Sequence, residues 1–285
     1  SPTVTTTYTV TVTGSNGCTA TDAVVVNVNT TAPTADAGVD KNLNCTTTST
    51  SIGTTAISGN TYSWSPSVGL SSTTIAQPTA TPSSTQTYTV TVTAANGCTA
   101  TDAVVVNVNT TVPTVNAGPD KNLTCTTTSA TIGSVAISGN TYSWSPATGL
   151  SSTTIAQPVA NPSVTTTYTV TVTGSNGCTA TDFVTVNVNT TLPTVNAGPD
   201  KNLDCTTTSA TIGTTGISGN TYSWSPATGL NSTTIAQPVA SPSTTTSYTV
   251  TVTGSNGCAA SDVVTVNVSL AVPVANAGLD KELNC

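Results

Sequence analysis

The chain repeats itself every 80 residues, with no insertion or deletion to interrupt the period. Its three tryptophans keep that step, at Trp64, Trp144 and Trp224. The eight cysteines form two series with the same step: Cys18, Cys98, Cys178 and Cys258, and Cys45, Cys125, Cys205 and Cys285. Repeats of roughly 20–50 residues usually build solenoids, whose units cannot bury a core alone. About 80 residues suffice for a small self-contained domain, so we expect domains in tandem.

The period predicts three complete domains and two partial ones. The complete domains are residues 33–111, 113–191 and 193–270. Residues 1–31 match the C-terminal part of a repeat, and residues 273–285 match the N-terminal part of a further one. Joined head to tail, the two pieces would still lack the counterpart of roughly residues 126–160, including the Trp. We therefore expect this chain to be a segment of a longer repetitive protein.

Within a repeat the residue pattern indicates β-strands. In 168–173 Tyr and Val alternate with Thr, so the apolar side chains share one face of a strand. Residues 182–188 alternate in the same way. Between the two runs, residues 174–177 read Gly-Ser-Asn-Gly, a hairpin signal because Asn-Gly readily adopts positive φ.

Shorter strands are expected upstream, at 130–132, 141–145 and 153–157, and no stretch shows a helical period. Six or seven short strands in about 80 residues, with a Trp early and a Tyr-containing hairpin late, indicate an antiparallel sandwich. The predicted fold class is therefore all-β, with tandem immunoglobulin-like β-sandwiches.

The composition excludes many functions. Only 5% of the residues are charged, the formal net charge is −7, and His and Arg are absent. Without His there is no imidazole base, and without Arg there is no bidentate clamp for phosphate. Four Lys against eleven acids would repel nucleic acid and anionic membranes. No apolar run approaches 20 residues, so we expect no membrane insertion in this segment.

Several motifs resemble those of a known class of repeats. They are Tyr-Ser-Trp-Ser-Pro at 142–146, Thr-Tyr-Thr-Val-Thr-Val-Thr at 167–173, Asn-Gly-Cys-Thr-Ala-Thr-Asp at 176–182, and Asn-Ala-Gly-Pro-Asp-Lys at 116–121. Their order and spacing resemble PKD-like and immunoglobulin-like tandem repeats of large secreted or cell-surface proteins of Bacteroidota-type bacteria, including gliding-type adhesins. The resemblance implies an extracellular β-sandwich with a role in stalks, adhesion or scaffolding, and it implies no catalytic residue.

The regularly spaced cysteines predict disulfides and an oxidising compartment. Neighbouring cysteines could pair within a repeat, as Cys125 with Cys178, or across a linker, as Cys98 with Cys125. Cys98 lies at a predicted hairpin tip, and the strand after it runs roughly ten residues at about 3.3 Å each before the next domain begins. A disulfide needs Cα atoms within about 7 Å, so the pairing across the linker is disfavoured.

We therefore predict disulfides within each repeat and external partners for the remaining cysteines. The predicted pairs are Cys45–Cys98, Cys125–Cys178 and Cys205–Cys258, and Cys18 and Cys285 would pair outside this segment. Zinc is the rival interpretation, but the chain offers neither a CxxC pair nor a His.

Two further sets of residues have both a structural and a functional interpretation. Trp64, Trp144 and Trp224 could be sugar-binding platforms, but a core position is favoured because immunoglobulin-like folds bury a Trp. Asn116, Asp120 and Asp182 are weak calcium candidates, since calcium prefers oxygen ligands. The alternative is that they cap turns by accepting backbone hydrogen bonds. No other cofactor is predicted.

The predicted function is structural and non-enzymatic: a stiff rod, filament or sheath outside the cell or on its surface. The linkers 109–114 and 189–194 are short, contain Pro and have nearly the same sequence. Expected partners are other copies of the chain, packing through neutral faces rich in Thr. One alternative is an adhesin whose repeats bind glycan or another cell. Another is a set of spacer domains in a large secreted hydrolase.

Overall fold

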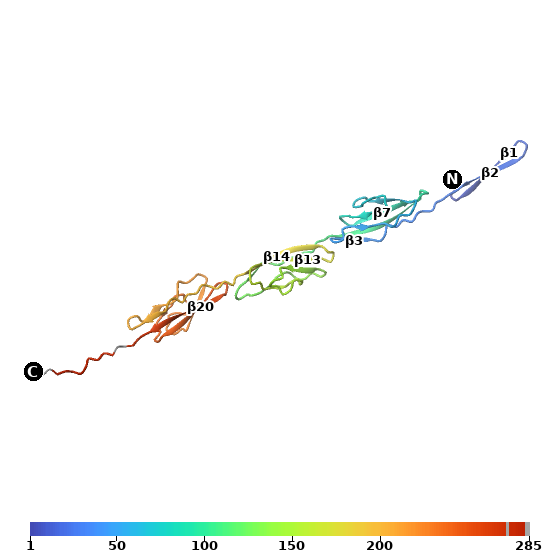
Figure 1. Cartoon of the computed structure of the whole chain (residues 1–285). Coiled ribbons are helices and arrows are strands. Elements are labelled where there is room, and N and C mark those ends of the chain that lie inside the picture. The colour runs from blue at the N-terminus through green and yellow to red at the C-terminus, as the bar shows by residue number, and fades with distance from the viewer. Residues whose placement is uncertain (272–273, 283–285) are drawn as a thin grey trace. The chain divides into compact units, whose positions relative to one another are not determined.

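The computed structural model describes residues 1–271 and 274–282 and shows an all-β chain (Figure 1). The first hairpin consists of β1 (Thr6–Thr13) and β2 (Thr19–Val26). Residues 33–111 contain β3 (Lys41–Asn44), β4 (Thr50–Ser51), β5 (Thr61–Ser65), β6 (Thr79–Ala80), β7 (Gln86–Thr93) and β8 (Thr99–Asn109). None of the described residues forms a helix long and apolar enough to cross a bilayer.

The next two repeats contain the same six strands. Residues 113–191 contain β9 (Lys121–Leu123), β10 (Ala130–Thr131), β11 (Thr141–Ser145), β12 (Val159–Ala160), β13 (Thr166–Thr173) and β14 (Thr179–Val188). Residues 193–270 contain β15 (Lys201–Leu203), β16 (Ala210–Thr211), β17 (Thr221–Ser225), β18 (Val239–Ala240), β19 (Thr246–Thr253) and β20 (Ala259–Val268). The predicted all-β class and its tandem organisation are confirmed.

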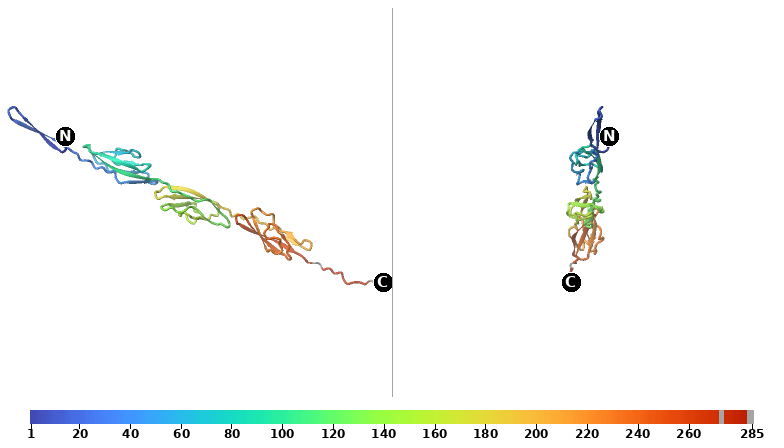
Figure 2. Two further views of the ribbon diagram at one scale, coloured as in Figure 1. Left: turned by 180° about the vertical axis from the view of Figure 1, so that it is seen from behind. Right: turned by 90° about the vertical axis from the view of Figure 1, so that its right-hand side faces the viewer.

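Each complete repeat contains a four-stranded sheet and a two-stranded one. Figure 2 shows the ribbon from two further directions. In residues 33–111 the larger sheet has the order β3-β8-β7-β5, and β4 pairs with β6. The long strands β7 and β8 are antiparallel, with Tyr88 opposite Val104. The short first strand β3 runs parallel to β8, with Leu43 opposite Val108. The sheet is therefore mixed, and this parallel pairing decides where the cysteines lie.

The core of residues 33–111 lies between the two sheets. Its ten buried members are Ala37, Leu43, Ile52, Trp64, Ala80, Tyr88, Val90, Val92, Val104 and Val106. The exposed fraction of Trp64 is 3%, and its indole N–H donates to the carbonyl of Ile75 at 2.9 Å. The hydroxyl of Tyr88 donates to the carbonyl of Val68 at 2.7 Å. Both buried aromatic side chains thus satisfy their polar atoms, as burial requires.

The chain divides into two compact units whose limits differ from those of the repeats. The first unit contains residues 1–115, 137–141 and 171–180, and the second contains 116–136, 142–170 and 181 onward. The tip of the β13–β14 hairpin and the turn at 137–141 therefore group with the preceding repeat. The domain boundaries given above stay a prediction.

Candidate functional site at the repeat junctions

Two disulfides connect successive repeats. Cys45, just after β3, bonds to Cys178 at the tip of the β13–β14 hairpin, and their Cα atoms lie 5.0 Å apart. Cys125 bonds to Cys258 in the same way, again with 5.0 Å between Cα atoms. Both pairs are 133 residues apart in sequence, so one rule of connection applies to both junctions.

The predicted pairing within repeats is wrong. The pairs Cys45–Cys98, Cys125–Cys178 and Cys205–Cys258 do not occur. The reason is the direction of the first strand. Because β9 runs parallel to β14, with Leu123 opposite Val188, Cys125 lies at the end of the sheet opposite to the hairpin tip. Cys178 precedes Val188 by about ten residues, which places it roughly 33 Å away along the strand.

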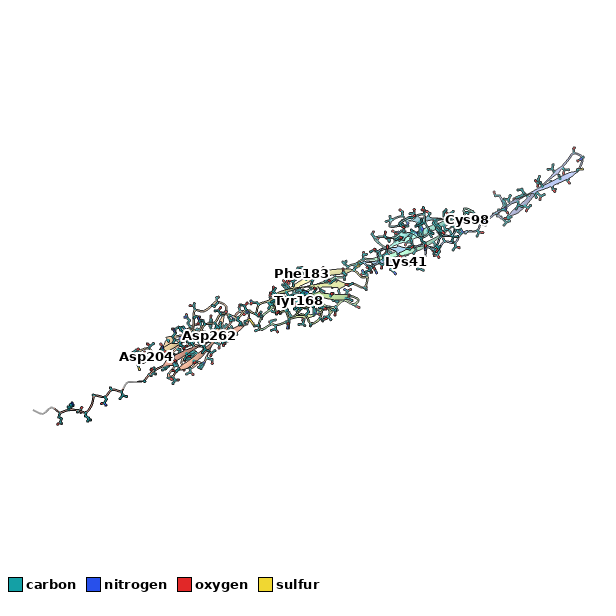
Figure 3. The ribbon with its side chains drawn as sticks, viewed as in Figure 1. Lys41, Cys98, Tyr168, Phe183, Asp204 and Asp262 are labelled. Carbon is teal, nitrogen blue, oxygen red and sulfur yellow. A yellow bond between two sulfur atoms is a disulfide. The ribbon has the colours of Figure 1, made fainter. Side chains whose placement is uncertain are left out.

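Three cysteines are unpaired among the described residues. Cys98 and Cys205 are without the partners predicted for them, and Cys18 is also free. Cys98 lies at the tip of the β7–β8 hairpin, in the position that Cys178 has in the next repeat (Figure 3). The external partner predicted for Cys18 stays a prediction. Cys285 lies outside the described residues.

Local hydrogen bonds shape both halves of the Cys45–Cys178 link. On the β3 side, the Asn44 side-chain oxygen accepts the N–H groups of Thr46 and Thr47 at 2.9 and 2.8 Å. This Asx-type turn presents Cys45, which lies between Asn44 and Thr46. On the other side, the tip of the β13–β14 hairpin is closed by the Gly174 N–H, which donates to the Cys178 carbonyl at 2.9 Å.

Asn176 ties the hairpin tip to the linker. Its side-chain amide nitrogen lies 3.2 Å from the carbonyl oxygen of Asn109, 3.1 Å from the Asn109 side-chain oxygen and 2.9 Å from the carbonyl oxygen of Thr111. Its own side-chain oxygen accepts the Cys178 N–H at 3.2 Å. We call this set of contacts the amide clamp. One side chain thus holds both the linker and the residue that forms the disulfide.

The amide clamp recurs at the other junctions. Asn256 donates to Thr191 at 2.9 Å, and Asn96 donates to Thr31 at 3.0 Å. Sequence reasoning recognised the Asn-Gly pair only as a turn signal and missed this second role. The available signal was the constant spacing between each Asn-Thr-Thr linker and the next Asn-Gly-Cys tip.

The glycine at the tip has a positive φ and lies against the preceding repeat. Gly177 has a φ of +74°, and a Cβ atom there would lie 2.7 Å from the Cγ2 atom of Thr46. Gly257 stands in the same relation to Thr126, also at 2.7 Å. A residue with a side chain would be strained in φ, and the Thr46 side chain would have to shift to make room.

A shallow groove lies beside the amide clamp. It has a volume of about 420 Å³, and its lining includes Val112, Pro113, Ile137, Asn140 and Ser175. A second groove, of about 390 Å³, lies at the equivalent place near residues 29–34 and 94–96. The lining of both grooves contains amide, hydroxyl and apolar groups and no ionisable side chain. Such a surface can offer hydrogen bonds and apolar contact, but not acid–base chemistry.

Two of the calcium candidates connect the segment before the first strand of a repeat to its last strand. Asp182 accepts the Ala117 N–H at 2.8 Å, and Asp120 accepts the Thr185 N–H at 2.8 Å. Asn116 accepts the N–H of Gly118 at 2.7 Å. These are capping contacts to the backbone. No group of three or more His, Cys, Asp or Glu residues able to hold a metal ion occurs in residues 1–271 and 274–282. The use of these residues for calcium stays a prediction.

In the third repeat the same contact shifts the pKa of Asp262, whose side chain is labelled in Figure 3. Asp262 accepts the N–H of Ala197 at 2.8 Å. Hydrogen bonds from the backbone N–H groups of Ala197 and Val263 lower the pKa of Asp262, because they stabilise its ionised form. The charge of this aspartate therefore contributes to docking the start of the repeat onto β20.

The outer face of each large sheet carries hydroxyl groups and no charge. The register places Ser63, Thr91 and Thr101 in one row across β5, β7 and β8, and Thr61, Thr93 and Thr99 in the next. In the third repeat the hydroxyls of Thr251 and Ser261 lie 3.0 Å apart. An exposed apolar side chain follows these rows in the later repeats, Phe183 at 65% exposure and Val263 at 54%.

No protein-family model matches the chain, and no curated protein sequence matches it. Solved structures do match. One is a Ca²⁺-stabilised adhesin that helps an Antarctic bacterium bind ice, with 15% identity, a TM-score of 0.48, and coverage of 93% of this chain and 82% of that one. Another is the EC1-4 fragment of PcdhgB3, with 10% identity, a TM-score of 0.42, and coverage of 94% and 83%.

A third match is to extracellular domains 3-5 of Drosophila OTK, with 12% identity, a TM-score of 0.33, and coverage of 82% of this chain and 95% of that one. At these identities and TM-scores the likeness carries no argument about function. The resemblance to PKD-like repeats and to proteins of Bacteroidota-type bacteria gains no specific support from these matches.

Proposed function

We propose that this chain is a non-enzymatic structural region of an extracellular or cell-surface protein, built as a stitched row of β-sandwiches that forms a rod, filament or sheath. The observation that carries the proposal is the disulfide from each repeat to the next, Cys45–Cys178 and Cys125–Cys258. Disulfides persist in oxidising compartments and are rare in the cytosol. Disulfides placed between domains hold neighbouring repeats together covalently.

Three ties act at each of the two junctions that carry a disulfide, and together they favour stiffness. The linker is short and contains Pro113, which fixes φ. The amide clamp fixes the linker to the hairpin tip, and the disulfide joins that tip to the preceding repeat. Interfaces between domains in one chain usually permit relative motion unless they are large. Here covalent and hydrogen-bonded ties replace a large interface.

The favoured partners are other copies of this chain, packed through the outer sheet faces. Removing Thr and Ser hydroxyls from water costs little free energy when they find hydrogen-bond partners. Removing charged groups from water costs much more. The near absence of charge also removes one common defence against contact between sheet edges. Phe183 and Val263 add apolar area to these faces.

An adhesin is the second candidate, because the groove beside the amide clamp recurs at two described junctions. Its amide and hydroxyl groups suit the hydroxyls of a glycan. We also retain the PKD-like assignment and the Bacteroidota-type origin as proposals that rest on the sequence motifs.

Electron microscopy of the purified chain, with and without reductant, tests the structural proposal. We expect extended particles that associate side by side, and we expect shorter or more variable particles after reduction. Separate compact particles under both conditions would contradict a rod or filament. Binding of the oxidised chain to a glycan array, lost when Asn140 is replaced by Ala, would favour the adhesin instead.

A further inference from the structure

We propose that the disulfides give the chain a further function as a damage-tolerant tether: its repeats stay covalently joined after the backbone is cut, and the links limit extension under load. The inference rests on which cysteines are joined. It does not require that the chain forms a fibre.

The two disulfides close overlapping rings. One ring contains residues 45–178 and the other contains residues 125–258, so they share residues 125–178. Every peptide bond between Cys45 and Cys258 therefore lies inside at least one ring. Hydrolysis of one such bond adds one water and leaves both S–S bonds untouched, so the two fragments remain one molecule.

The linkers gain most from this arrangement. Linkers are preferred sites of proteolytic cleavage, and Val112 and Leu192 in the two linkers are each 62% exposed. The linker at 109–114 lies inside the first ring only, and the linker at 189–194 lies inside the second ring only. Disulfides within repeats would have left both linkers outside every ring, so a single cut would have separated the domains.

One cysteine of each link is shielded, whereas its bonded partner, Cys45 or Cys125, is exposed. Cys178 is 1% exposed and Cys258 is fully buried. Thiol–disulfide exchange requires a thiolate to reach a sulfur atom, so shielding slows it. The buried cysteine of each link is therefore less open to exchange than its exposed partner.

The rings also define the route by which tension passes through an opened chain. The shortest covalent path runs to Cys45, across to Cys178, back along the backbone to Cys125, across to Cys258 and onward. Residues 46–124 and 179–257 are outside that path and carry no load. At about 3.5 Å per residue, the fully opened oxidised chain reaches roughly 440 Å, against roughly 1,000 Å after reduction.

Site-specific cleavage tests the tether directly. Each of three variants carries one recognition sequence for a specific protease: in the linker at 29–34, which is outside both rings; in the linker at 109–114, inside one ring; or in the exposed turn at 138–140, inside both. Free thiols are alkylated before denaturation to prevent exchange. The digests are compared by denaturing electrophoresis with and without reductant.

We expect the 29–34 variant to separate under both conditions. The 109–114 variant should keep its full mass without reductant and give two fragments with it. Cys45→Ser, added to both variants, removes the ring of residues 45–178. The 109–114 variant should then separate without reductant, while the 138–140 variant stays joined through Cys125–Cys258. Separation of the unsubstituted 109–114 variant without reductant overturns the proposal.

Pulling the chain by its ends gives a second readout that does not depend on cleavage. We expect the total extension of the oxidised chain to be less than half that of the reduced chain. Equal extensions would overturn the load path. Because both tests use single molecules or denatured fragments, their failure is distinguishable from a failure to form rods or filaments.

Discussion

The β1–β2 hairpin and the β7–β8 hairpin have nearly the same sequence and the same register, but only one is buried. Tyr8 lies opposite Val24 as Tyr88 lies opposite Val104. Yet Tyr8 is 49% exposed and Tyr88 fully buried, and Val10 is 57% exposed whereas Val90 is 1% exposed. The first hairpin is a two-stranded sheet alone, whereas the second belongs to a four-stranded sheet.

The difference shows that strand pairing and burial have separate origins. Strand pairing is local, set by the alternation of residues and by the Asn-Gly turn. Burial is not local, because it depends on residues that precede the hairpin in a complete repeat. Before β7 these include Ile52, Trp64 and Ala80. An isolated two-stranded hairpin is only marginally stable in water. In the 285-residue chain, substitutions should therefore matter in β7–β8 and have little effect in β1–β2.

The largest effect should come from removing the buried Trp. Trp64→Ala leaves a cavity between the sheets and should lower the free energy of unfolding of residues 33–111 by about 3–5 kcal/mol. Amide hydrogen exchange of β7 should then approach that of β1, since both hairpins would be without a packed second layer. Exchange of β7 that remains slow in the variant would show that the hairpin is stable without the core.

A glycine under the Trp should give the next largest effect. Gly53 has a φ of +80°, and a Cβ atom there would overlap the Ala76 carbonyl oxygen. Gly53→Ala should cost about 2–4 kcal/mol, from overpacking and from the positive φ. Gly59, with a φ of +83° and no atom within 4 Å of the added Cβ, is the matched control. Its substitution by Ala should cost only about 1 kcal/mol.

Denaturant unfolding followed by Trp fluorescence measures both glycine variants. The background should keep Trp64 and replace the other two tryptophans by Phe. Equal losses for the two variants would mean that the positive φ alone decides the effect, and that the close approach to Ala76 contributes nothing.

The hydroxyl of the buried tyrosine should contribute less. Tyr88→Phe removes the donor to the Val68 carbonyl and should cost about 1–2 kcal/mol, because a buried acceptor loses its partner. Tyr8→Phe should change nothing measurable, since Tyr8 is half exposed. The two variants are compared by thermal unfolding, and a similar shift for both would contradict the contrast between the hairpins.

The smallest effect should be the pH dependence of the third repeat. Hydrogen bonds lower the pKa of Asp262 in the folded state, so the unfolded state binds the proton first as pH falls. The stabilisation is present above the ordinary Asp pKa of about 3.9, and it is lost as pH falls through the folded pKa. A chain that keeps only Trp224 should show this loss in acid denaturation.

Asp262→Asn is the control for that experiment, because Asn still accepts a hydrogen bond but does not titrate in this range. The variant should lose this part of the acid sensitivity. An unchanged acid transition would mean that other carboxyl groups govern it.

The sequence was sufficient for the two long strands of each hairpin, whereas the strand predicted at 153–157 is wrong, since the structure has bends there and β12 begins at Val159. The alternation of Tyr168, Val170 and Val172 predicted a strand with one apolar face, and all three side chains are buried. The Asn-Gly pair predicted the hairpin turn, and the cysteine pattern predicted that disulfides form. Each of these inferences needed only the local period and the chemistry of the side chains.

The cysteine pairing could not be read in the same way. It depends on the direction of β9, a strand of three residues, because parallel pairing with β14 sends Cys125 away from Cys178. The pattern of so short a strand holds no information about its direction. The amide clamp was missed for a related reason, since Asn176 contacts a linker 65–67 residues earlier in sequence.

Each repeat carries one cysteine for the neighbour before it and one for the neighbour after it, as Cys178 and Cys125 show in the middle repeat. A gene for such a chain can grow or shrink by whole units without new compensating mutations. Every inserted unit brings both of its cysteines with the correct spacing, whereas a partial unit would leave one cysteine without a partner. Where the length of the chain is the trait that varies, natural selection would therefore preserve the strict 80-residue period.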